Sequence, residues 1–385
     1  MNDIYLHRDL ENVIKEASQY FSVISVTGPR QSGKSTMLMH LFPEYKYFSM
    51  KDLNILEFAE NDPIAFLNQC GDSGMLIDEV QKAPALLNYI QGIVDRNPKR
   101  KFLITGSSNF QMLQQMSESL SGRAAVFELM PMTQAEGKSE SLNLDEQLFN
   151  GLFPAICTGK NLAKFFYPSY TRTYIEKDVR DFMHIQDQML FMKFMKLCAA
   201  RIGSQFNASE LSNEVGVDAK TITRWLSALQ TSYIVALMPP YFDNLTKRLV
   251  KTPKFYFTDT GLACYLLDIE SPRQLMRDKM RGAIFENMIV MEVMKHRFNQ
   301  GKEGGVYFYR DSNHNEVDIL LKEEGKFTAI EVKSATTYNK TFEKTLKKID
   351  SWVNGPVVKK MIVYAGDFEN YEGDIQLVNY NNLHL

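Results

Sequence analysis

Cysteine is scarce in this sequence, and the few that occur form no metal-binding or disulfide pattern. Cys70, Cys157, Cys198 and Cys264 are spread through a chain of 385 residues. No CxxC or Cys/His pairing points to a zinc site, and no spacing points to a disulfide framework. The pattern favours a reducing compartment.

Long apolar runs and a surplus of either charge are missing as well. No stretch approaches the about 20 apolar residues of a membrane-spanning helix, and the N-terminus lacks the pattern of a signal peptide. We therefore expect a soluble, cytoplasmic protein with no membrane partner. Lysine and arginine number 44 and aspartate and glutamate 46, a net charge of −2. Any contact with nucleic acid has to come from a local basic patch.

The remaining composition is that of a globular protein with more than one domain. Hydrophobic residues make up 44% and charged residues 23%, which supplies enough apolar surface for sizeable cores. The length predicts two or three domains. Changes of pattern along the chain divide it into segments 1–135, 136–200, 201–275 and 276–385.

The first segment alternates strand-like and helical patterns, which predicts a parallel sheet with crossover helices. We expect strands at 21–26, 75–77 and 102–105 and helices at 34–41 and 85–95. The acidic, serine-containing stretch 135–146 is typical of a linker. It opens a linker and helical, lid-like region over 136–200, in which residues 170–182 have helical spacing.

The third segment has the order of a winged helix. Two helical patterns, 208–215 and 218–231, flank Gly216 at the position of a tight helix-turn-helix turn. Strand-like stretches follow at 232–238 and 254–258, with a basic loop between them.

The last segment, 276–385, has the pattern of a compact α/β unit. We expect helices at 283–298 and 342–353. The expected strands are 306–309, 316–321, 328–333 and 360–364.

A phosphate-binding loop follows the first predicted strand. Residues 28–35 fit G-x-x-x-x-G-K-[ST] in full, with a strand before and a helix after, as the motif requires. Glycines let backbone N–H groups turn inward, and the helix N-terminus adds positive potential. Lys34 is expected to reach the β- and γ-phosphates, and the Ser35 hydroxyl to coordinate Mg²⁺. The nucleotide-binding residues predicted are Gly28, Pro29, Arg30, Gln31, Ser32, Gly33, Lys34, Ser35 and Thr36.

Two carboxylates end the second predicted strand. Asp78 would hold Mg²⁺ through water, and Glu79 would orient and deprotonate the attacking water. The alternative is a helix N-terminal cap after a buried strand.

Several motifs together resemble a family of prokaryotic AAA-type ATPases that carry a C-terminal domain of unknown function similar to the restriction-endonuclease fold. They are the runs 25–36, 76–81, 105–109 and 120–123. The resemblance continues over nearly the whole chain through 151–154, 174–179 and 257–262, which have no evident chemistry.

The resemblance implies two further roles near the nucleotide. A polar side chain after the third strand would act as a sensor of the γ-phosphate or of the lytic water, and Thr105, Ser107 or Asn109 could serve. A plain turn is the alternative. Arg123 would be an arginine finger acting in trans on a neighbouring subunit; otherwise it is a surface or packing arginine.

A second polar constellation lies in the last segment. Strand alternation places Glu331 and Lys333 on one face, and pairing of their strand with 316–321 would bring Asp318 beside them, with Glu286 joining from the preceding helix. This resembles the PD-(D/E)xK nuclease arrangement, in which Asp318 and Glu331 would bind Mg²⁺ and Lys333 would position water. The alternative is an exposed strand face with ordinary charges.

The helix-turn-helix carries polar residues where a DNA reader would have them. Four of them could face a DNA groove or the DNA backbone: Lys220, Thr221, Thr223 and Arg224. The loop 244–251 adds a basic patch made of Lys247, Arg248 and Lys251. The alternative is an internal packing module without DNA contact.

The sequence therefore predicts an α/β protein made of a P-loop AAA-type ATPase domain, a helical and winged-helix middle, and a restriction-endonuclease-like α/β C-terminal domain. The predicted function is an ATP-hydrolysing switch or motor coupled to a DNA-directed winged helix and a nuclease-like domain. The rival is an ATP-gated interaction protein whose C-terminal domain binds a partner or nucleic acid without cleaving it. ATP and Mg²⁺ are the expected cofactors, and ATP, DNA and further copies of the chain the expected partners.

Overall fold

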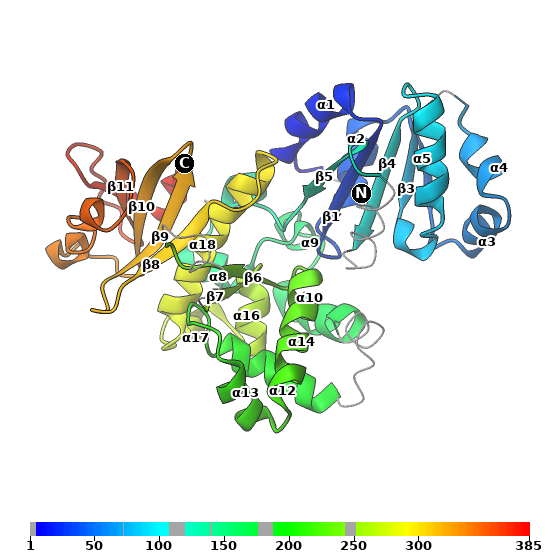
Figure 1. Ribbon diagram of the computed structural model, residues 1–385. Coiled ribbons are helices and arrows are strands. Elements are labelled where there is room, and N and C mark those ends of the chain that lie inside the picture. Colours follow the sequence, from blue (N-terminus) through cyan, green and yellow to red (C-terminus); the bar gives the residue numbers. More distant parts are fainter. Residues whose placement is uncertain (1–4, 72, 108–119, 139–140, 176–187, 243–251) are drawn as a thin grey trace.

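The protein folds into an N-terminal α/β part, a mainly helical middle and a C-terminal α/β part, with the long helix α18 between the two sheets (Figure 1). The computed structural model describes residues 5–71, 73–107, 120–138, 141–175, 188–242 and 252–385. Asn109 and the basic loop residues Lys247, Arg248 and Lys251 lie outside the described residues.

The N-terminal part is built on a parallel sheet of five strands in the order β2-β3-β4-β1-β5. The strands β1 and β3 are buried along their whole length, because helices cover both faces of the sheet. The elements are α1 (Leu10–Tyr20), β1 (Val23–Gly28), α2 (Lys34–Leu41), β2 (Lys46–Ser49), α3 (Leu53–Asn61), α4 (Pro63–Asn68), β3 (Met75–Asp78), η1 (Val80–Lys82), α5 (Leu86–Arg96), β4 (Phe102–Ser107) and β5 (Ala124–Glu128).

Alternate side chains of each central strand enter two different cores. Ile24 and Val26 pack with α1 and α2 on one face. Val23 packs with α4 and α5 on the other face, together with Phe102 and Ile104. Because β4 lies between β1 and β3, the ends of the P-loop strand and of the two polar-ended strands meet at one edge of the sheet.

The predicted linker at 135–146 is wrong. Its described residues include α7 (Gln134–Gly137) and the start of α8 (Leu144–Asn150), and each helix begins with a capping box. Thr133 pairs with Glu136 in the first, and Asn143 with Glu146 in the second. The acidic and polar residues that resembled a linker therefore satisfy helix N-termini.

The middle contains the predicted helix-turn-helix and strand pair. Gly216 has φ 93° at the turn between α13 and α14, a left-handed conformation that suits glycine. These elements are confirmed, whereas the winged-helix assignment stays a prediction. The elements are α9 (Pro154–Cys157), α10 (Ala163–Tyr170), the π-helical turn η3 (Thr171–Ile175), α12 (Gln188–Ala199), α13 (Ala208–Val215), α14 (Ala219–Thr231), β6 (Val235–Met238), β7 (Lys254–Phe257), α16 (Thr260–Leu266) and α17 (Pro272–Leu275).

Two motifs without evident chemistry turn out to hold the middle together. The Asp259 carboxylate caps α16 and also accepts hydrogen bonds from the Leu152 N–H, at 2.7 Å, and from the Tyr167 hydroxyl, at 2.6 Å. A Cβ on Gly151 would lie 2.2 Å from that hydroxyl oxygen, and one on Gly261 would lie 2.3 Å from it. Both glycines are therefore needed for close packing around Tyr167.

The C-terminal part is a mixed sheet of five strands in the order β12-β11-β10-β9-β8. The helix predicted at 342–353 is wrong: the segment holds short 3-10 turns, although Leu346, Ile349 and Val353 are buried at helical spacing. That spacing suits a 3-10 turn as well as an α-helix. The elements are α18 (Arg281–Asn299), β8 (Val306–Arg310), β9 (Glu316–Glu323), β10 (Lys326–Lys333), η4 (Lys340–Glu343), η5 (Ile349–Ser351), β11 (Val357–Tyr364), β12 (Gln376–Asn379) and η6 (Tyr380–Asn382).

One hydrophobic core continues from the middle into the C-terminal part. It includes Phe194 and Leu229 of the middle helices, Phe285 of α18 and Ile330 of the C-terminal sheet. The segment that ends at residue 242 also pairs with the edge strand β8, because the Tyr241 N–H donates to the Phe308 carbonyl at 2.7 Å. The middle and C-terminal parts thus fold against each other.

A buried ion pair joins the N-terminal part to α18. Arg8 Nε lies 3.1 Å from the Glu136 carboxylate, and both side chains are almost fully buried. Arg8 also donates to the carbonyls of Ser32, at 2.9 Å, and Met130, at 2.8 Å. Glu136 accepts from Asn299 of α18 at 3.2 Å. Beside this contact, Lys295 of α18 donates to a backbone carbonyl just before α7.

No helix among the described residues combines the length and the apolar character that crossing a membrane requires.

We expect Arg8→Ala to destabilise the protein by about 3–5 kcal/mol, because the Glu136 carboxylate would stay buried without its cation. Urea unfolding followed by circular dichroism measures the change. Lys196→Ala is the matched control. It removes the exposed pair between Lys196 and Asp268 and should cost less than about 1 kcal/mol. Equal small losses in the two variants would contradict the structural role of Arg8.

Candidate functional site

The P-loop has the backbone geometry of a phosphate cradle. Gly33 adopts φ 94° directly before α2, and Gln31 is left-handed at φ 62°. A Cβ on Gly28 would lie 2.2 Å from the Leu129 carbonyl oxygen, so only glycine fits there. Such a backbone lets N–H groups turn inward ahead of the helix N-terminus, which favours an anion.

Lys34 folds back on the loop that carries it. Its Nζ donates to the carbonyls of Gly28, at 2.9 Å, and Pro29, at 2.8 Å. Burial lowers the pKa of Lys34 to about 8, against the opposing effect of Glu79 and Asp78. A bound phosphate would add negative charge beside this buried ammonium and so favour its protonated form.

Asp78 is the point where three elements converge. Its carboxylate accepts hydrogen bonds from Ser35 of α2 and Thr105 of β4 on one oxygen, and from the Tyr47 hydroxyl at 3.1 Å on the other. A hydroxyl and a carboxylate side by side are hard oxygen ligands of the kind Mg²⁺ prefers. The donor set fits a magnesium ion held between Ser35, Asp78 and a nucleotide.

Glu79 lies next to this point and is not a helix cap. It precedes η1, but its side chain makes no capping hydrogen bond. Its carboxylate contacts Lys51 Nζ at 3.0 Å and accepts from Gln81 Nε2 at 2.6 Å. Glu79 has φ 57°, a left-handed backbone that costs on the order of 1 kcal/mol or more and that clusters at functional sites.

A cavity of about 250 Å³ adjoins the P-loop. The N-terminal segment contributes Tyr5, which stacks on His40 of α2 with ring centroids 3.8 Å apart. Pro154 and Lys160 close the cavity from the middle part. Tyr5, His40 and Lys160 belong to no sequence motif, and they come from three separate stretches of the chain.

The structure separates the sensor candidates from the arginine finger candidate. Thr105 contacts Asp78, and the Ser107 backbone pairs with that of Gly28. Arg123 precedes β5, so it lies at the opposite edge of the sheet from the P-loop of its own chain. There its guanidinium forms an exposed, two-pronged ion pair with Asp95.

The four predicted C-terminal residues come together. The ladder between β9 and β10 ends at Ile319 and Ile330, and beyond it the Asp318 carboxylate accepts from the Val332 N–H at 2.8 Å. Lys333 Nζ lies 2.6 Å from Glu331 and 3.7 Å from Asp318.

The electrostatics of this cluster agree with its close packing. Burial, followed by the charge of Asp318, raises the pKa of Glu331 to about 7. The same two causes raise the pKa of Glu286 on α18. The two glutamates therefore both lie close enough to Asp318 for its charge to disfavour their ionised forms.

A second lysine, missed by the sequence analysis, balances the charge of the cluster. Lys254 of β7 is buried, with its Nζ 2.5 Å from Glu316 and 3.4 Å from Glu286. Within the described part of the chain, no three His, Cys, Asp or Glu side chains are grouped so that they could hold a metal ion. In this arrangement Lys254 and Lys333 form ion pairs with carboxylates of the cluster.

The predicted DNA-facing residues occupy one face of α14. Lys220, Thr223 and Arg224 are exposed, whereas Ile222 and Trp225 are buried in the core. Thr221 is half-buried and its hydroxyl donates to the capping residue Asp218 at 2.8 Å. Three of the four side chains are therefore available to a partner.

Three family models match successive stretches of the chain. Residues 20–137 match a model described as an AAA domain. Residues 141–273 match a domain of unknown function (DUF8612), and residues 281–383 match another (DUF4143).

Similar proteins occur in bacteria and archaea. Uncharacterized proteins of Mycobacterium bovis and Mycobacterium tuberculosis are each 28% identical over 94% of this chain and 80% of their own length. An uncharacterized protein of Methanocaldococcus jannaschii is 21% identical over 83% of this chain and 76% of its own length.

Among solved structures, a Walker-type ATPase of Pyrococcus abyssi aligns with 69% of this chain and 96% of its own, at 13% identity and a TM-score of 0.48. A signal transduction ATPase with a tetratricopeptide repeat sensor from Pyrococcus horikoshii aligns with 76% of this chain and 48% of its own, at 10% identity and a TM-score of 0.26. The P-loop geometry and the match to the family model together identify residues 20–137 as a P-loop domain of the AAA ATPase type.

Proposed function

We propose that the protein hydrolyses ATP at the P-loop and uses the nucleotide state to act on its middle and C-terminal parts. The observation that carries the proposal is the convergence of Ser35 and Thr105 on Asp78, next to the buried Glu79. Packing alone does not explain why a hydroxyl and two carboxylates lie together beside a phosphate-binding loop.

Each residue has a role that follows from its position. Lys34 exchanges its backbone carbonyl partners for the β- and γ-phosphates. Ser35 and Asp78 hold Mg²⁺, which neutralises charge on the phosphates when bound. Glu79 accepts the proton of the attacking water, and Lys51 and Gln81 fix the direction of its carboxylate. Thr105, which contacts Asp78, is the proposed sensor.

The cavity beside the P-loop is the proposed place of the nucleoside. It opens from Gly33 and Thr36 towards Tyr5 and Pro154, so a nucleotide with its phosphates in the loop would extend into it. Its walls come from the N-terminal segment and from the middle part. Bound ATP would therefore contact both.

Two buried contacts offer routes from the nucleotide to the rest of the chain. Arg8 binds the carbonyl of Ser32 in the P-loop and the carboxylate of Glu136, which in turn contacts α18. Separately, the Tyr233 hydroxyl of the middle part shares a hydrogen bond of 2.8 Å with Thr27, directly before the P-loop. A shift of the loop would strain both contacts.

We expect Glu79→Gln to keep Mg²⁺-ATP binding and to lose hydrolysis by about 100-fold or more, because only the base is removed. Lys34→Ala is the companion variant and should lose binding itself. Calorimetric titration with ATP and phosphate release measure the two properties. Hydrolysis at the wild-type rate in Glu79→Gln would refute the assignment of the base.

We propose that Arg123 acts on the nucleotide of a neighbouring copy of the chain. The opposite edge of the sheet is the wrong place for action on its own P-loop, and an exposed guanidinium is available to a second subunit. This proposal requires ATP-promoted oligomers.

Mixing two inactive variants tests action in trans. Lys34→Ala retains Arg123, and Arg123→Ala retains the P-loop, so mixed oligomers contain some complete sites. We expect each variant to be inactive alone and the mixture to recover a measurable part of the ATPase rate. Arg96→Ala at the end of α5 serves as the arginine control. Full activity of Arg123→Ala alone, or no recovery on mixing, would exclude the role.

A metal-dependent nuclease is the second candidate function, favoured by the convergence of Asp318, Glu331, Lys333 and Glu286. Asp318 and Glu331 would bind the metal, which activates water beside the scissile phosphate, and Lys333 would orient that water. The exposed face of α14 is the proposed duplex contact. The rival is a partner-binding domain in which Lys254 and Lys333 keep the carboxylates neutralised.

We expect the wild-type protein to bind Mn²⁺ and to cleave DNA only with Mg²⁺ or Mn²⁺, and Asp318→Asn to lose both properties by at least about 100-fold. Asp374→Asn is the control, since Asp374 is an exposed carboxylate of the same part, paired with Lys360. Calorimetry with Mn²⁺ and a cleavage assay on single- and double-stranded DNA are the measurements. Neither metal binding nor cleavage in the wild type would leave the partner-binding rival.

A further inference from the structure

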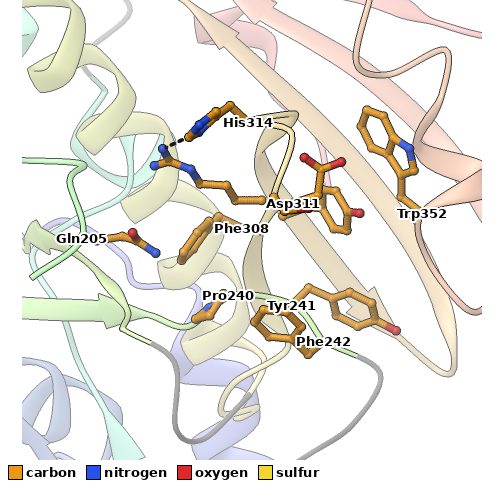
Figure 2. Close-up of a pocket in the computed structure, with 11 residues that line it drawn as sticks. Gln205, Pro240, Tyr241, Phe242, Phe308, Asp311, His314 and Trp352 are labelled. Atoms are coloured by element: carbon orange, nitrogen blue, oxygen red, sulfur yellow. Dashed lines mark hydrogen bonds between the residues drawn. The ribbon is translucent and has the colours of Figure 1, made fainter. Parts of the chain in front are cut away.

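A cavity of about 610 Å³ lies where the middle part meets the C-terminal sheet (Figure 2). It is the size of pockets that hold small ligands. The middle part contributes Gln205 and the segment 240–242, and the C-terminal part contributes β8, the turn after it and Trp352. This cavity is separate from the nucleotide site and from the carboxylate cluster described above.

Aromatic rings form much of the cavity wall. Tyr309 and Trp352 are stacked, with centroids 5.2 Å apart and ring planes 7° from parallel. Phe308 and Tyr241 are buried at its floor. Trp352 and Tyr309 remain partly exposed to the cavity. Such a wall offers flat faces to a planar ring rather than an irregular aliphatic surface.

Polar and cationic groups border the same space. Arg310 is exposed at the rim, with its guanidinium 3.3 Å from His314 Nδ1 and 3.6 Å from Glu316. Gln205 projects from the middle part, on the far side of the view from Trp352 in Figure 2. An arginine that borders the same cavity as an aromatic pair can bind a phosphate while a ring stacks on that pair.

The cavity is connected to the carboxylate cluster through one pair of residues. Glu316 contacts Arg310 at the rim and Lys254 behind it, and Lys254 reaches Glu286 of the cluster. Lys254 also lies 5.3 Å from the centre of the Phe308 ring in the cavity floor. A ligand that draws Arg310 away from Glu316 would therefore alter the partners of a cluster residue.

We propose that this cavity binds a nucleobase together with the phosphate attached to its sugar. The base stacks on the outer face of the Tyr309–Trp352 pair, and Arg310 pairs with the phosphate. A free nucleotide and a single-stranded nucleic acid present the same chemical group. The proposal is independent of ATP hydrolysis and of any cleavage at the carboxylate cluster.

Trp352 provides a direct reading of occupancy. The chain has two tryptophans, and Trp225 is buried against Phe191 and Phe194 in the middle core. Full-length protein with Lys34→Ala and Trp225→Phe would report Trp352 alone, with P-loop binding removed. Thymidine monophosphate and a short oligodeoxythymidylate are the two probes. We expect saturable quenching of Trp352 fluorescence by at least one of them.

The pattern of binding distinguishes the source and tests the site. Quenching by the mononucleotide indicates a free nucleotide, and quenching by the oligonucleotide alone indicates a single strand. Arg310→Ala and Tyr309→Ala should each weaken binding about tenfold or more. Arg277→Ala, an exposed arginine after α17, should leave it unchanged. The proposal is overturned by absence of quenching with both probes at millimolar concentration, or by wild-type affinity in Arg310→Ala. Where Tyr309→Ala itself changes the fluorescence of Trp352, equilibrium dialysis measures the affinity of that variant for the two probes.

Discussion

The buried pair of Arg8 and Glu136 is the constraint on which the arrangement of the N-terminal part and α18 depends. A guanidinium with almost no exposed surface has to find partners for its donors inside the protein. It finds a P-loop carbonyl, a carbonyl after β5 and a carboxylate at the start of α7. Arg8 and Met130 are 122 residues apart in sequence, so satisfying one side chain fixes the N-terminal segment, the loop and the approach to α18 together.

The nucleotide site was largely predictable because its residues lie in short, contiguous motifs. In residues 28–36, the glycines and the helix that follows determine the backbone conformation of the loop locally. Asp78 and Glu79 end an apolar strand, and parallel strands bring such ends to one edge. The same logic placed Asp318, Glu331 and Lys333 together, because alternation along paired strands determines which side chains share a face.

The parts that could not be predicted depend on contacts between distant stretches. No sequence motif includes Arg8, Tyr5 or Lys254. The contacts that give each of them a role form only when distant segments pack together. The region 342–353 was misread because burial every three or four residues fits two kinds of helical turn. The linker at 135–146 was misread because capping residues and linker residues share a polar composition.

The shared core around α18 has a consequence for how this chain can be rearranged. A domain that is joined to its neighbour by a bare linker can be exchanged between genes at the linker. Here a break near residue 276 would uncover Phe285 and Ile330, together with the inner faces of the helices before it. Recombination would thus tend to keep the middle and C-terminal parts as one inherited unit. Fragment swaps designed in the laboratory should take residues 141–385 as a single block.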